Sequence, residues 1–164
     1  HLRVHIRTKL KAGTLLKCGV PAFSMNIKGV IFMLEANSQT LTVTANTDIT
    51  FANINIQTGI TAVLDSDNAT IRLNRPGIYR VDFTAYGSST AAGTIGAQLY
   101  ANDTAVNRAS SVATTAAGAP QAIAFSTLVA VGSTTAGKTA KLNVKYTGAA
   151  GILNNADVIV TKIA

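Results

Sequence analysis

GIYRVDFTAY, residues 77–86, carries the clearest structural signal in the chain. Side chains of a β-strand alternate between its two faces. One face of this stretch is therefore apolar and consists of Tyr79, Val81, Phe83 and Ala85. The turn sequence Asn74-Arg75-Pro76-Gly77 comes just before it, with a proline that presets φ and a glycine that allows a tight reversal. We expect a strand that leaves this turn antiparallel to the preceding strand and buries one face in a β-sandwich.

The same alternation recurs along the rest of the chain. We predict strands at residues 30–35, 41–44, 49–54, 60–64, 69–73, 78–86, 94–101, 105–112, 122–131, 138–146 and 156–163. Turn sequences such as Asp65-Ser66-Asp67-Asn68 and Ala101-Asn102-Asp103 fall between them. Many short strands with no helical periodicity predict an all-β sandwich or barrel.

Several predicted strands are apolar on both faces, most clearly residues 122–131, where Ala, Ile, Phe, Leu and Val occupy both. A sandwich sheet buries only one face against its partner sheet, so the second apolar face predicts burial against another chain. Only 13% of the 164 residues are charged, which also suits close contact between subunits. The candidates for this contact are Tyr100, Phe125 and Leu128.

Charge divides the chain into a basic arm, residues 1–28, and a nearly neutral domain, residues 29–164. The arm has six Lys and Arg and no acid, whereas the domain has eight Lys and Arg against seven Asp and Glu. Residues 2–11 alternate apolar and basic side chains, which predicts an extended strand. A lone strand leaves its backbone unpaired, so we expect it to join a sheet edge or lie on a partner surface. On this interpretation the arm is an attachment segment, and its cationic contacts are Arg3, Arg7, Lys9, Lys11 and Lys17.

Two other interpretations of the arm stay open. It could be an edge strand of the domain whose cations prevent aggregation. It could also contact nucleic-acid phosphates, but no aromatic side chain precedes Phe23 to stack on bases, which disfavours this interpretation.

The sequence contains no residue set for catalysis or for metal binding. His1 and His5 have no acid or thiolate at ligand spacing, and Asp65 and Asp67 begin like a calcium loop but lack its further acids. Cys18 is the only cysteine, so there is no intrachain disulfide, and it is expected to be a buried hydrophobe. No apolar run reaches the length of a membrane span. We therefore predict a protein that is not an enzyme, uses no metal or cofactor and does not enter a membrane.

The sequence ATIRLNRPGIYRVDFTA at residues 69–85, followed by GAQLYAND at residues 96–103, resembles the central signature of the complement and tumour-necrosis-factor-like jelly rolls. The resemblance extends over residues 47–164, and the Ala-, Thr- and Gly-rich texture is most similar to bacterial and phage members. These include virion-fibre, capsid-decoration and spore-surface proteins. The resemblance implies an antiparallel ten-strand jelly roll that associates as a tight trimer, here with an extended N-terminal arm. The chain has no collagen-like stalk and no Trp, which argues against immune-type receptor recognition.

Together these observations predict a non-enzymatic structural protein of a phage virion. We expect a homotrimeric jelly-roll capsid decoration or head fibre on the outer surface of the virion, docked through the basic arm to the capsid or another structural protein. Two alternatives stay open. One is the receptor-binding tip of a phage fibre, which would recognise a cell-surface glycan or protein, and the other is a bacterial surface or spore-coat protein.

Overall fold

The computed structural model describes residues 31–132 and 139–164, and Ile31–Ala164 forms one compact unit. The described residues form ten strands: β1 (Phe32–Val43), β2 (Asn53–Gln57), β3 (Ala62–Leu64), β4 (Ile71–Leu73), β5 (Gly77–Ser89), β6 (Gly93–Ala101), β7 (Thr104–Thr115), β8 (Gln121–Val131), β9 (Ala140–Tyr146) and β10 (Gly151–Lys162). No helix long and apolar enough to cross a membrane occurs in these ranges. The basic arm predicted at residues 1–28 lies outside the described part of the chain.

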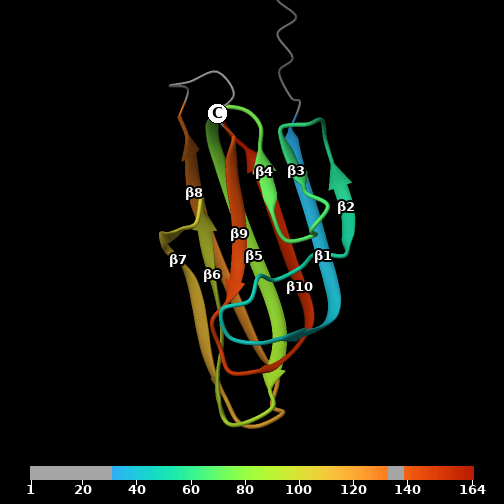
Figure 1. Ribbon diagram of the computed structural model, residues 1–164, viewed down its shortest axis with the longest axis vertical. Helices are drawn as coiled ribbons and strands as arrows, with labels where there is room; N and C mark the ends of the chain where they lie inside the picture. Colours follow the sequence, from blue (N-terminus) through green and yellow to red (C-terminus); the bar gives the residue numbers. More distant parts are fainter. Residues whose placement is uncertain (1–30, 133–138) are drawn as a thin grey trace, which may run out of the picture. The chain divides into compact units, whose positions relative to one another are not determined.

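The strands form two antiparallel five-stranded sheets that pack face to face (Figure 1). Sheet 1 has the order β2-β1-β10-β5-β8, and sheet 2 has the order β3-β4-β9-β6-β7. Strands β7 and β8 therefore lie at one side of the sandwich, and β2 and β3 at the other (Figure 1). This arrangement confirms the predicted all-β, ten-strand jelly roll of the tumour-necrosis-factor type.

Strand β5 carries the alternation on which the fold prediction depends. Its predicted apolar face, Tyr79 to Ala85, is buried between the sheets. The Tyr79 hydroxyl donates a hydrogen bond of 2.7 Å to the Arg75 carbonyl, which satisfies its polar group inside the core. Phe83 stacks on Phe125 of β8 with ring centroids 5.2 Å apart. Each such buried side chain contributes about 1.5–3 kcal/mol, so this face is a main source of stability.

The Pro76-Gly77 turn joins the two sheets, which corrects the expected antiparallel pairing with the preceding strand. β4 pairs with β3 and β9, whereas β5 pairs with β10 and β8. The connection from β5 to β6 also changes sheets, because β6 pairs with β7 and β9 and not with β5. Gly77 has φ of 144°, and a Cβ there would overlap the Ala164 carbonyl oxygen and the Lys162 side chain. The glycine is needed at this crossover, where the C-terminal residues lie close to its backbone.

Two strand predictions near the start of the domain are also corrected. β1 is one strand where two were predicted, because its pairing with β10 continues through Asn37 and Gln39. The strand predicted at residues 49–54 is shifted to Asn53–Gln57. Ile49 and Phe51 are buried, but they lie in the loop before β2, where their backbone N–H groups donate single hydrogen bonds to the carbonyls of Val144 and Asn68. Their alternation reflects burial in a loop, and sequence periodicity cannot distinguish this from a strand.

The turn predicted at Ala101-Asn102-Asp103 is confirmed. Asn102 and Asp103 have φ of 48° and 64° and join β6 to β7 through a two-residue loop. Positive φ at both central positions is the geometry that favours Asn and Asp in tight hairpins.

Candidate interaction surfaces

The candidate site residues fall in separate environments. Arg3, Arg7, Lys9, Lys11 and Lys17 lie outside the described residues. Tyr100 is half-buried on the outer face of sheet 2, where the Lys145 amino nitrogen lies 4.9 Å from its ring centroid. Leu128 is on the outer face of sheet 1 and is 59% exposed. The structure therefore does not bring the predicted interface residues together.

Phe125 faces the interior and is only 8% exposed, which removes it from the candidate interface. Its partner is Phe83 in the same sheet, on the face that packs against sheet 2. The two-faced pattern of residues 122–131 was correctly identified, but Phe125 belongs to the buried face. The opposite face of β8, from Ala122 through Leu128 to Ala130, is exposed throughout.

An apolar surface surrounds Leu128 at one end of sheet 1. We define the β5–β8 surface as Ile78, Ala124, Leu128, Ala130 and Ile163, all of which are exposed. Ile78 is the cross-strand partner of Ala130, and the backbone N–H of Ile163 donates a hydrogen bond of 2.8 Å to the Ile78 carbonyl. Leu128 lies opposite Arg80 and so is a diagonal neighbour of Ile78. Within the described chain nothing covers these side chains.

Acidic side chains lie further along the same outer face. Asp157 of β10 is opposite Asn37 of β1 and Thr84 of β5. Its Oδ1 atom is buried and has no hydrogen-bond partner among the described residues. Burial raises the pKa of Asp157, and the nearby Glu35 carboxylate raises it further. Asp82 differs because it forms an ion pair of 2.9 Å with Arg80.

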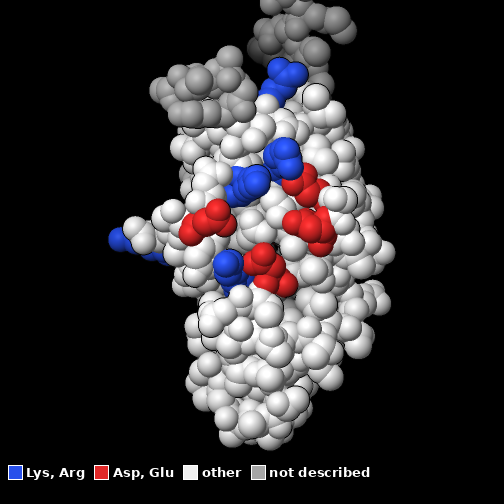
Figure 2. Space-filling view, viewed as in Figure 1, with Lys and Arg blue, Asp and Glu red and all other residues white. Residues whose placement is uncertain are grey.

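The outer face of sheet 2 also carries charged side chains of both signs. Lys and Arg lie among Asp and Glu over the upper and middle parts of the view in Figure 2, and its lower part has no charged residue. Arg72 of β4 forms an ion pair of 2.6 Å with Asp65. Asn143 of β9 donates a hydrogen bond of 3.3 Å to Asp48. Mixed charges of this kind favour contact with water over a dry protein interface.

Asp65 and Asp67 form a turn, as expected from the missing calcium ligands. Asp67 accepts hydrogen bonds from the backbone N–H groups of Ala69 and Thr70, at 3.0 and 2.9 Å, and from the Thr70 hydroxyl at 2.7 Å. These donors, the Thr70 hydroxyl above all, lower the pKa of Asp67. No cluster of three potential metal ligands occurs within residues 31–132 and 139–164.

A pocket opens at the end of the sandwich where the sheets are joined by the Pro76-Gly77 turn. It has a volume of about 450 Å³ and is lined by Phe32, Gly59, Ile60, Thr61, Arg75 and Lys162. No sequence motif predicted it. The sequence does contain one indication of this pocket. Lys162 continues the buried alternation Ala156, Val158, Val160, so a cation stands where the next apolar side chain is expected.

Comparison with solved structures places the fold among tumour-necrosis-factor and complement domains. The Eiger TNF structure from S. frugiperda has a TM-score of 0.65 and 12% identity, and the match covers 82% of this chain and 93% of that one. Murine APRIL gives a TM-score of 0.65 and 10% identity over 82% and 100% of the two chains. PRD1 vertex protein P5 gives a TM-score of 0.51 and 14% identity over 83% and 99%. No protein family and no curated protein matches at the level of sequence.

Proposed function

We propose that this chain is a non-enzymatic structural protein of a phage virion, a homotrimeric jelly-roll capsid decoration or head fibre. The observation that carries the proposal is the uncovered β5–β8 surface on a tumour-necrosis-factor-like jelly roll. Exposed apolar side chains that lie close together, as Ile78, Leu128 and Ala130 do here, mark a contact surface.

Self-association is the use of this surface that fits the sequence and the fold. Ala130 is small and lies opposite Ile78 and two residues from Leu128, so another backbone can approach closely beside these larger side chains. Arg80 lies within this surface, opposite Leu128, and its ion pair with Asp82 lowers the cost of removing the two charges from water. A closed ring of copies would cover the surface on every subunit.

The virion role rests on two weaker supports. One is the fold likeness to a vertex protein, P5 of PRD1. The other is the charge distribution, in which six cations and no acid are confined to residues 1–28 while the domain is nearly neutral. A basic arm on a neutral head fits docking to an acidic surface of a capsid or another virion protein.

The test is the solution mass of the full chain and of a chain that starts at Gly29, measured by light scattering at several salt concentrations. The proposal predicts trimers from both chains, because the jelly roll and not the arm provides the contact. It also predicts that the shorter chain fails to attach to virions that lack the protein, in an add-back assay with the full chain as control. Monomers from the shorter chain, or its normal attachment to virions, would contradict the proposal.

A further inference from the structure

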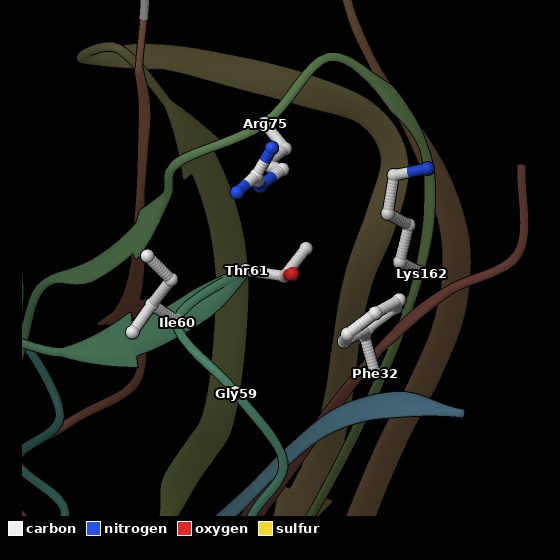
Figure 3. A pocket seen from close by; sticks show the side chains of 6 residues that line it. All are labelled: Phe32, Gly59, Ile60, Thr61, Arg75 and Lys162. Atoms are coloured by element: carbon white, nitrogen blue, oxygen red, sulfur yellow. The ribbon is translucent and has the colours of Figure 1, made fainter. Parts of the chain in front are cut away.

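We propose that the pocket at the sandwich end binds an acidic sugar residue, with its carboxylate between Arg75 and Lys162. The pocket lining shares no residue with the β5–β8 surface, although Lys162 directly precedes Ile163 of that surface. Figure 3 shows the Arg75 and Lys162 side chains on opposite sides of the opening, with the Thr61 side chain between them.

The two cations of the pocket form no ion pair with an acidic side chain in the described part of the chain. The ion pairs of the described residues join Arg72 to Asp65 and Arg80 to Asp82, and the pocket lining contains no Asp or Glu. Lys162 is half-buried and lies at an inward-facing position of β10, directly opposite Phe32 of β1. Its side chain fills the space that Gly77 leaves by having no Cβ. A cation held in this way is best satisfied by an anion that enters the pocket.

The remaining lining residues indicate that the anion carries a polar ring. Phe32 packs on Gly59, where an added Cβ would lie 3.4 Å from the Phe32 ring, and Ile60 is largely exposed beside the opening. These two side chains offer apolar surface. Thr61 is only 3% exposed, its side chain lines the pocket, and its hydroxyl makes no hydrogen bond within the described residues. The hydroxyl is therefore free to form a hydrogen bond with a polar group of the ligand.

A ligand uses the whole pocket only if it has an anionic group for the two cations, an apolar face for Phe32 and Ile60, and a polar group for the Thr61 hydroxyl. Inorganic sulfate would pair with the cations but leave Phe32 and Ile60 in water. A neutral sugar would contact the apolar side chains and Thr61 but leave the two cations unpaired. A sugar acid supplies a carboxylate for the Arg75 guanidinium, a C–H face for the apolar side chains and hydroxyls for Thr61. The volume of about 450 Å³ lies in the range of small-molecule sites and has room for one or two sugar rings.

The test is isothermal titration of the full chain with D-glucuronate, with D-glucose and sodium sulfate as probes of the ring and of the anion alone. We expect saturable glucuronate binding that weakens with salt, and binding of the other two probes about tenfold weaker or undetectable. Arg75→Gln should weaken glucuronate binding by about tenfold. Arg75 is exposed and uses only its carbonyl within the fold, so this variant is expected to fold.

Two further variants separate the site from general charge effects. Thr61→Val keeps the size of the side chain and removes the hydroxyl, so it should weaken binding while the fold stays intact. Lys145→Gln removes a cation from the outer face of sheet 2 and should leave binding unchanged. The proposal is overturned if glucuronate does not saturate, if glucose or sulfate binds equally well, or if Arg75→Gln has no larger effect than Lys145→Gln.

Discussion

The two outer faces of the sandwich differ in the partners of their polar side chains and in their exposed apolar area. On sheet 2, Arg72 pairs with Asp65, Lys145 lies over Tyr100 and Asn143 bonds to Asp48, although the Nε atom of Arg72 is buried without a partner among the described residues. On sheet 1, the β5–β8 surface is apolar and uncovered, and Asp157 has an oxygen atom without a partner among the described residues. Each face therefore has one buried polar atom without a partner, and the clearer difference is the uncovered apolar β5–β8 surface, which only sheet 1 has and which a second chain could cover.

The interior is common to both faces, so a change there should affect the whole domain and gives the largest expected effect. Phe83→Ala removes a fully buried ring that stacks on Phe125, and we expect a loss of about 3–5 kcal/mol in the free energy of unfolding. Urea denaturation measures it, with Thr84→Ala on the exposed side of the same strand as control. A loss below about 1 kcal/mol would show that the stability of the domain does not depend on the Phe83 ring.

The pairing of polar groups around sheet 2 can be tested at the turn between β3 and β4, where Asp67 accepts hydrogen bonds. Asp67→Ala leaves three donors of Ala69 and Thr70 without their acceptor, and we expect a loss of about 1–2 kcal/mol. The pKa of Asp67 is lowered in the folded protein, so its contribution is present above the ordinary value of 3.8 and disappears as the pH falls through the folded value. Ser66→Ala in the same turn is the control. Equal melting temperatures for the Asp67→Ala variant and the wild-type protein at neutral pH would refute the role of Asp67.

Asp157 should titrate with the opposite sign, and its effect is the smallest. Its pKa is raised, so the unfolded chain ionises first and the folded state loses stability as the pH rises above the ordinary value of 3.8. We expect Asp157→Asn to stabilise the protein by less than about 1 kcal/mol at neutral pH and to have no effect well below the ordinary pKa. Thermal unfolding across this pH range measures it, with the ion-paired Asp82→Asn as control. Destabilisation by Asp157→Asn at neutral pH would show that the carboxylate is satisfied after all.

Local sequence patterns predicted most of the fold because they report burial directly. The inward face of β5, the Asn102-Asp103 turn and the ten-strand jelly roll were all predicted from alternation, turn residues and resemblance. The errors lie where a pattern has two physical causes. Ile49 and Phe51 alternate because a loop is buried, and Pro76-Gly77 turns the chain into the other sheet, a choice that depends on tertiary packing.

The sites were less predictable than the fold. Leu128 was a candidate for a contact with another chain, but only the structure shows that it is exposed and a diagonal neighbour of Ile78, which is distant in sequence. Phe125 was assigned to a contact surface because the sequence does not say which of two apolar faces turns inward. The pocket unites residues from four parts of the chain, and of these only Lys162, a cation in a buried alternation, carried a signal of its own.

The proposed function requires above all that copies of the chain associate through the β5–β8 surface. The outer face of sheet 2 is not part of this contact. Leu128 and Val112 offer a matched pair, because they are 59% and 63% exposed and lie on the outer faces of sheets 1 and 2. The decisive measurement is the solution mass of the full chain carrying Leu128→Glu or Val112→Glu. We expect monomers from Leu128→Glu, because burying an unpaired carboxylate is costly, and wild-type trimers from Val112→Glu. Trimers from Leu128→Glu, or dissociation by Val112→Glu alone, would contradict this assignment.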